Sequence, residues 1–170
     1  MKSGILFLII LIPVFGISQK HKPSAANVFE GQPGIEIVNL IKWKHLKDGF
    51  SFGDGHVAYV FRLDSNHRFE YVESSCVGDI KLDQGIWKIK DNKNLILKSK
   101  NKRYIFELIK LRNFLFYIMP SQREDFVKDL ESERKQTADY QIEKDDSRYT
   151  REFLMGFHLV RKYYGSELIQ

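Results

Sequence analysis

Apolar and polar positions alternate along the middle of the chain in runs of strand length. In the clearest run, from Val57 to Leu63, every second residue is a large apolar one, and the alternation resumes at Phe69 and Tyr71. A period of two places alternate side chains on opposite faces of a half-buried strand. The pattern therefore predicts a mainly β protein.

Turn residues separate these runs at even intervals. We predict turns at 64–67, 91–94, 100–102 and 112–113, because these positions hold short polar or charged side chains. The third strand is expected to open at Gly85, where a glycine permits a bend or a close backbone approach. Short strands joined in this way indicate an antiparallel meander over 35–120, forming a barrel or a curled sheet.

The segments before the meander have weaker patterns. Residues 19–34 mix Pro, Gly, Ser and Lys without periodicity, which predicts a flexible leader. A first strand is expected around Trp43, within Ile35–Leu46. The glycine-rich tract Lys47–His56 is predicted to be a loop.

The composition changes after Pro120, and residues 121–170 are predicted to be a charged helical segment that packs on the same domain. Ser121 and Glu124 have the spacing of a capping box that starts a helix. Residues 136–149 are expected to form a loop. The run from Phe153 to Tyr164 fits either a second helix or a strand that closes a barrel, and we favour the helix.

The start of the chain is typical of a secretory signal peptide. The uncharged segment Gly4–Gly16 follows a basic residue, and Gly16 and Ser18 provide the small side chains needed for cleavage between Ser18 and Gln19. A membrane anchor would need roughly 18 to 20 apolar residues, and Pro13 interrupts this segment. We therefore expect export to the periplasm or beyond, removal of residues 1–18, and no transmembrane span in the mature protein.

The composition supplies a large aromatic core but no internal disulfide. The chain has 13 Phe, 8 Tyr and 2 Trp among 170 residues, enough for one domain with one core. Cys76 is the only cysteine, so packing alone must hold the domain in an oxidising compartment. We expect Cys76 to lie in a hairpin connection, where it could also link two copies of the chain.

No motif for a cofactor, a metal or catalysis is found. The histidines lack metal-ligand spacing, and the chain has no nucleophile elbow, phosphate-binding loop or dinucleotide fingerprint. We therefore predict no cofactor, no metal and no catalytic residue. These features favour a non-enzymatic protein, and an uncharacterised hydrolase is the alternative.

Positive charge concentrates in the second half of the meander. From Lys81 to Arg112 there are ten basic residues and three acidic ones. Lys98, Lys100 and Lys102 are candidates for binding an anionic component of the cell envelope. The alternative roles for these lysines are keeping the sheet soluble and docking the acidic helical segment. Nucleic acid is not an expected partner of an exported protein.

Four short motifs follow one another along the meander: Phe61-x-x-Asp64, Phe69-x-Tyr71, Gly85-x-Trp87-x-Ile89 and Leu95-x-Leu97. Between Val57 and Met119 this pattern resembles small lipocalin-like β-barrel domains of exported bacterial proteins of unknown function. True lipocalins carry Gly-x-Trp on the first strand, whereas here it lies in mid-chain. No family binding residues are therefore carried over.

The resemblance implies a barrel that binds a small apolar or amphipathic ligand, which is our first hypothesis. A barrel of about eight strands holds either side chains alone or one small ligand. Seven aromatic residues would line its interior in either case: Tyr59, Phe61, Phe69, Tyr71, Trp87, Tyr104 and Phe106. The alternative is an envelope interaction module that uses the basic sheet face or the C-terminal helix.

Overall fold

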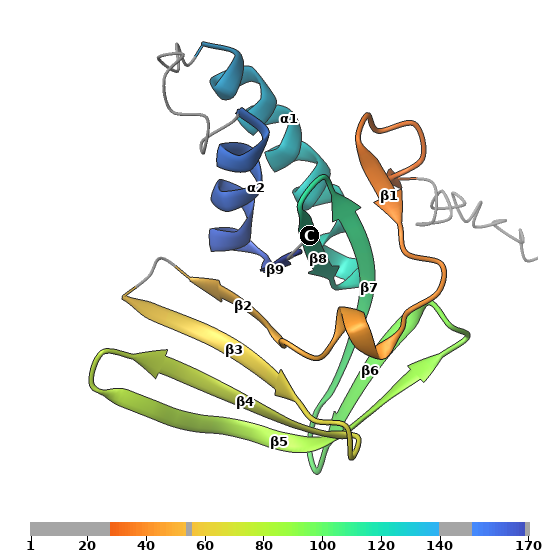
Figure 1. Ribbon diagram of the computed structural model, residues 1–170, viewed down its shortest axis with the longest axis vertical. Helices are drawn as coiled ribbons and strands as arrows, with labels where there is room; N and C mark the ends of the chain where they lie inside the picture. Colours follow the sequence, from red (N-terminus) through yellow and green to blue (C-terminus); the bar gives the residue numbers. More distant parts are fainter. Residues whose placement is uncertain (1–27, 54–55, 140–150, 169–170) are drawn as a thin grey trace, which may run out of the picture.

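The computed structural model describes residues 28–53, 56–139 and 151–168. Figure 1 shows a strongly curved sheet below and two helices above it. In chain order the elements are β1 (Ile35–Ile37), η2 (Trp43–His45), β2 (Phe50–Gly53), β3 (Val57–Leu63), β4 (Arg68–Ser75), β5 (Gly78–Lys90), β6 (Asn94–Ser99), β7 (Arg103–Leu111), β8 (Phe114–Ile118), η3 (Pro120–Gln122), α1 (Arg123–Asp139), α2 (Arg151–Lys162) and β9 (Tyr164–Glu167). The predicted leader up to residue 27 lies outside the described residues.

The sheet closes on itself. Strands β2 to β8 form an antiparallel meander in which each strand pairs with the one before it. Strand β9 pairs with both β8 and β2, which completes an eight-stranded antiparallel barrel (Figure 1). Strand β1 adds to β7, with Ile35 opposite Leu111. The predicted antiparallel barrel is therefore confirmed.

The predicted loop at 47–56 is wrong in part, because Phe50–Gly53 is strand β2. Phe50 lies opposite Phe61 on β3, and its buried ring stacks on Tyr117 with the centroids 3.8 Å apart. The strand has only four residues and ends at a glycine with φ of 141°. The glycines on both sides of this short strand predicted a loop, although Phe50 and Phe52 alternate with smaller residues as in a strand.

The predicted strand around Trp43 is also wrong. Trp43 lies in the 3₁₀ helix η2, and the strand of this region is β1, which ends before Trp43 at Ile37. The indole of Trp43 stacks on Trp87 with the ring centroids 5.7 Å apart and the planes at 6°. Packing against Trp87, rather than pairing with another strand, positions this segment.

Strand β5 begins at Gly78, so the predicted strand start at Gly85 is wrong, while the close backbone approach there is confirmed. A Cβ at Gly85 would lie 2.1 Å from the carbonyl oxygen of Lys98 and 2.9 Å from the Phe69 ring. Only glycine fits at this position in the middle of the strand, because neighbouring atoms occupy the space that a side chain would need. Cys76 lies in the β4–β5 turn, as predicted.

The run from Phe153 to Tyr164 is helical up to Lys162, and the strand that closes the barrel lies beyond it, where none was predicted. The favoured helix is confirmed as α2, and the closing strand follows it directly as β9. Helix α1 begins at Arg123, directly after η3, so Ser121 lies within η3 and does not cap α1 as predicted. At the start of η3, the Met119 N–H donates to the Gln122 side chain at 3.3 Å. Residues 136–139 are helical rather than loop, and 140–149 lie outside the described residues.

Two apolar clusters hold the molecule together. One fills the barrel and includes Phe61, Leu97, Phe106 and Tyr117. The other lies between the outer surface of β7 and β8 and the helices, where Phe126 contacts both Phe116 and Phe29. All five residues of β8 are buried, because this strand contributes to both clusters.

Candidate functional site

The seven aromatic residues predicted for the interior all pack in the barrel cluster. Four of them are buried, and Tyr59, Tyr71 and Tyr104 are half-buried at its edge. The rings of Phe61 and Tyr71 stack with centroids 4.3 Å apart, and Phe61 also contacts Phe106 at 5.6 Å. Six of these rings form a network of contacts, whereas the Trp87 ring packs against Trp43 and His67. The role of the seven side chains in lining a ligand site stays a prediction.

Polar groups accompany the half-buried tyrosines. The Tyr164 hydroxyl donates to the Tyr71 hydroxyl at 3.0 Å, and the Tyr104 hydroxyl donates to the Asp83 carboxylate at 3.0 Å. Burial raises the pKa of both Tyr104 and Tyr164 well above the ordinary value of 10. Sequence reasoning missed Tyr164, because only strand β9 brings it beside the meander.

Trp87 is anchored at the other side of this cluster. Its indole N–H donates to the backbone carbonyl of Asp64 at 3.0 Å, and the His67 ring lies against it at 4.3 Å. The β3–β4 turn is thereby fastened to β5. We infer a structural role for Trp87 from these contacts, since its ring is buried and its only polar atom is satisfied.

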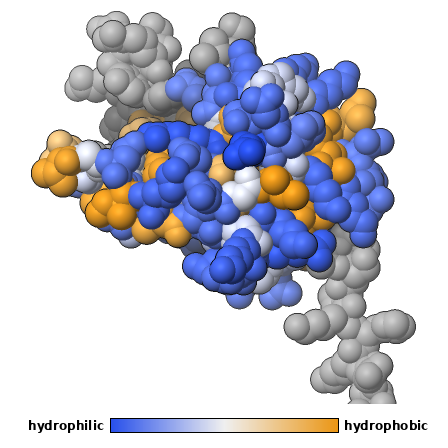
Figure 2. Space-filling view, turned by 90° about the horizontal axis from the view of Figure 1, so that it is seen from below, coloured by the Kyte–Doolittle hydropathy of each residue, from blue (hydrophilic) through white to orange (hydrophobic). Residues whose placement is uncertain are grey.

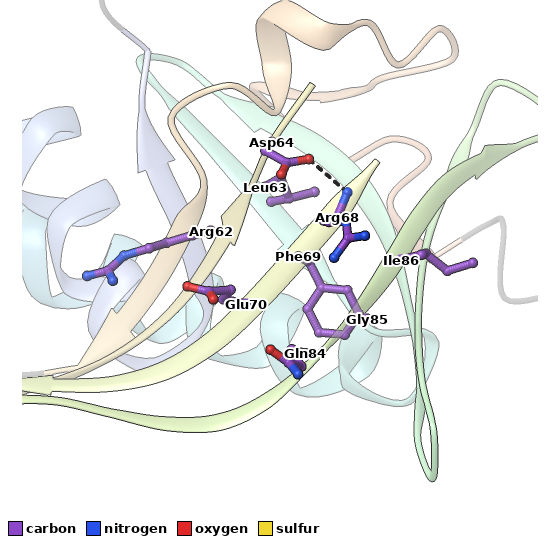
Figure 3. Close-up of a pocket in the computed structure, with 9 residues that line it drawn as sticks. All are labelled: Arg62, Leu63, Asp64, Arg68, Phe69, Glu70, Gln84, Gly85 and Ile86. Carbon is purple, nitrogen blue, oxygen red and sulfur yellow. Dashed lines mark hydrogen bonds between the residues drawn. The ribbon is translucent and has the colours of Figure 1, made fainter. Parts of the chain in front are cut away.

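A hollow of about 460 Å³ lies where β3, β4 and β5 run side by side (Figure 3). The strand register places Arg62, Glu70 and Gln84 in one row across its floor. Other lining residues come from the β3–β4 turn and the adjoining strand positions: Leu63, Asp64, Arg68, Phe69, Gly85 and Ile86. The hollow is therefore mixed in polarity.

Most charges of this first hollow already have partners. Arg62 pairs with Asp79 at 2.6 Å, and Glu70 accepts from Lys81 at 2.5 Å. The Asp64 carboxylate accepts from the Arg68 backbone N–H at 2.9 Å (Figure 3). The guanidinium of Arg68 has no partner among the described residues, which leaves one free cation at the edge of the hollow.

A second hollow of about 320 Å³ continues across β5, β6 and β7 and shares Ile86 with the first. Its lining residues interleave apolar and basic side chains: Ile86, Lys88, Ile96, Lys98 and Arg103. The register sets Ile86 opposite Lys98, which in turn lies opposite Arg103, and sets Lys88 opposite Ile96. We call these five residues the β5–β7 groove.

The β5–β7 groove combines exposed apolar surface with unpaired positive charge. Ile86 is 59% exposed, while Ile96 is buried and forms part of the floor. The side chains of Lys88, Lys98 and Arg103 have no hydrogen bond or ion pair within the described part of the chain. Figure 2 shows hydrophobic patches set among hydrophilic ones on the face opposite the helices.

The three lysines proposed from sequence divide between the groove and the turn beside it. Lys98 lines the groove, whereas Lys100 and Lys102 lie exposed in the β6–β7 connection. The Lys102 N–H donates to the Ser99 hydroxyl at 3.0 Å, so its backbone shapes the turn. Arg103 and the two isoleucines were missed, because only the pairing register reveals that they lie beside Lys98.

Neither a metal centre nor a membrane-spanning helix is found in the described ranges. No group of three or more His, Cys, Asp or Glu side chains there is arranged to hold a metal ion. No helix within 28–53, 56–139 and 151–168 is long and apolar enough to cross a membrane. Cys76 is exposed and unbonded to any cysteine.

Comparison with known proteins gives no relative. No protein-family model, curated protein or solved structure matches this chain. The protein belongs to the fold class of eight-stranded antiparallel barrels, which is consistent with a lipocalin-like barrel.

Proposed function

We propose that this protein is an exported, non-enzymatic β-barrel module that binds an anionic amphiphile of the cell envelope through the β5–β7 groove. The observation that carries the proposal is that three cations without a partner among the described residues meet the exposed side chain of Ile86. Export is supported by the leader pattern of residues 1–18.

The chemistry of the groove matches an amphiphile better than a small inorganic anion. Cations attract an anionic group at the surface of a membrane or a micelle. The isoleucines add favourable contact with an acyl chain, since burying apolar surface is favourable in proportion to its area. The stems of Lys88 and Lys98 flank Ile96 and extend this apolar contact below their ammonium groups.

Charge reversal in the groove tests the proposal. The wild-type protein is expected to float with vesicles of phosphatidylglycerol in phosphatidylcholine and not with phosphatidylcholine alone. Because each basic residue near an anionic surface contributes about 1 kcal/mol, the variant Lys88→Glu/Lys98→Glu should bind at least about 30-fold more weakly.

A matched control separates a specific site from general charge. Lys128→Glu/Lys135→Glu makes the same change in net charge at exposed positions on α1. This variant should bind within about twofold of the wild type, because salt screens the long-range attraction between the protein and the vesicle. Equal losses in both double variants, or unchanged flotation of the groove variant, would refute a site at the groove.

A small apolar ligand inside the barrel is the second candidate function. It is favoured by the half-buried Tyr71 and Tyr104 and the buried Tyr164, which bring hydroxyl groups and the Asp83 carboxylate to the aromatic cluster. The expected result is an extra mass in native mass spectrometry that disappears on delipidation. A clean apo mass that persists in Tyr104→Phe and wild-type protein alike would argue against it.

A further inference from the structure

Strand β5 is the longest strand of the barrel, and only Gly85 and Ile86 pair with strands on both sides. It pairs with β4 from Gly78 to Ile86 and with β6 only from Gly85 to Lys90. Between Gly78 and Gln84, therefore, no second strand of the described chain pairs with β5. This stretch is an open sheet edge within an otherwise closed barrel.

Exposed apolar side chains gather at this edge. Val77 is 92% exposed, Ile80 is 61% exposed and Leu82 is 43% exposed. In Figure 1 the β4–β5 hairpin projects away from the helices. Natural proteins usually protect such edges with charges, prolines or bulges, because unpaired backbone groups attract another strand.

The protection present on β5 is limited to a bulge and alternating charges. The register shifts between Tyr71 and Val72, whose partners are Asp83 and Lys81, so Leu82 occupies a bulge. The regular part of the edge therefore runs from Gly78 to Lys81. Its charges alternate in sign, with Asp79 and Lys81 flanking Ile80. Asp79 also pairs with Arg62 and Lys81 with Glu70 in the same chain, but both side chains stay partly exposed and can meet a second copy.

This order of residues is complementary to itself. When two antiparallel strands are centred on the same residue, Ile80 faces Ile80 of the second copy and Asp79 faces Lys81 of that copy, twice. Opposite charges and apolar pairs that lie directly across two strands stabilise the pairing, whereas like charges destabilise it. Centring on Leu82 would also pair opposite charges, but the bulge interrupts the ladder at that residue.

We propose that two copies of this chain pair along the open edge of β5, with the two-fold axis at Ile80. Residues directly opposite each other across an antiparallel pair lie on the same face of the sheet. The outer faces of the two barrels therefore become continuous. If the β5–β7 groove binds as proposed above, the dimer presents two grooves to one surface, which raises avidity; dimerisation itself does not depend on that function.

Complementary charge variants test the register. Sedimentation velocity of the full chain is expected to show a concentration-dependent dimer. Asp79→Lys alone and Lys81→Asp alone each place like charges opposite one another and should weaken the dimer about tenfold or more. Mixing the two variants restores opposite charges at both pairs, so a heterodimer should form with near wild-type affinity.

The rescue also distinguishes lost pairing from lost folding, because misfolded variants would not recombine. A wild-type chain that stays monomeric at its highest soluble concentration would overturn the proposal. So would dimers of either single variant as strong as the wild type.

Disulfide trapping provides an independent test in a Cys76→Ser background. A cysteine introduced by Ile80→Cys meets its own copy at the two-fold axis and should cross-link under mild oxidation. Val77→Cys is the matched control, since Val77 is more exposed but would face Asp83 of the second copy. Faster cross-linking through position 77 than through position 80 would indicate random collision and refute the pairing.

Discussion

The two sides of the barrel wall differ in what covers them. On the outer face of β7, Ile109 is 0% exposed beneath the helix layer, whereas Ile86 on the outer face of β5 is 59% exposed. We call the β7–β8 side the covered wall and the β3–β6 side the bare wall (Figure 1). Isoleucine is therefore a buried core residue on the covered wall, whereas on the bare wall it is exposed and packs against little of the chain.

The difference indicates which wall of the barrel carries the candidate site. On the covered wall, apolar residues follow one another in β8, as expected of a strand buried on both faces. On the bare wall, polar and charged residues such as Arg68, Glu70 and Lys88 predominate at the outer positions of β4 and β5. Packing does not account for an exposed isoleucine beside cations that have no partner in the described part of the chain, which makes the β5–β7 groove the candidate site.

The largest expected effect comes from removing the residue at the centre of the covered wall. Phe126→Ala should lower the free energy of unfolding by about 3–5 kcal/mol, because it leaves a cavity against Phe116 and Tyr163. Urea unfolding followed by fluorescence measures the change.

Phe157→Ala on α2 is the control for that substitution. The Phe157 side chain is 43% exposed and contacts the Arg161 guanidinium at 4.7 Å. We expect a loss of about 1 kcal/mol or less, the range of an exposed cation–π contact. Equal losses at the two positions would show that the helices do not bury the covered wall as described.

An intermediate effect is expected at Gly156, which fits α2 against the same wall. A Cβ at this position would lie 2.1 Å from the Phe114 ring. Gly156→Ala should therefore destabilise the protein by about 1–3 kcal/mol through overpacking. Thermal unfolding of Gly156→Ala, Phe114→Leu and the double variant would measure the coupling; a double variant as unstable as the sum of the singles would contradict this close contact.

The sequence predicted the elements whose patterns are local. Strands β3, β4, β6 and β7 follow a period of two between recognisable turns, and α2 has an apolar stripe. Closure could not be predicted, because it depends on the short strand β2 and on β9, which returns after two helices. The local pattern of apolar and polar residues in one strand does not show which distant strand pairs with it.

The candidate site was predictable only in part for the same reason. Lys98 was identified from its outward phase within a basic segment. Its neighbours Ile86 and Arg103 come from two other strands and meet it through register alone. A one-residue change of register would have moved each side chain to the other face.

A smaller effect is expected from the tyrosines inside the barrel at alkaline pH. Burial raises the pKa of Tyr164 in the folded protein above its ordinary value of 10, so the unfolded chain loses its proton first. The free energy of unfolding should then be steady below about pH 10 and fall above it, by up to about 1.4 kcal/mol per pH unit for this tyrosine.

Tyr164→Phe isolates that contribution. The variant loses the hydrogen bond to Tyr71 at every pH, which costs about 1 kcal/mol, but its stability should fall less steeply above pH 10 than that of the wild type. Urea unfolding at pH 8 to 11 gives both slopes. Parallel slopes would mean that Tyr164 titrates alike in the folded and unfolded chains.

The smallest change in stability is expected at Ile86, and it tests the comparison between the walls directly. Ile86→Ala should alter the free energy of unfolding by no more than about 0.5 kcal/mol, whereas Ile109→Ala on the covered wall should cost about 2–5 kcal/mol. Vesicle flotation should reverse the order, because Ile86→Ala removes apolar contact from the β5–β7 groove and Ile109 lies beneath the helices. If Ile86→Ala floats as fully as the wild type, Ile86 is not part of the binding surface and the basic residues alone bind the vesicles. A loss of stability there as large as at 109 would mean that the bare wall is covered in solution, as pairing of two copies on this side of the barrel would allow.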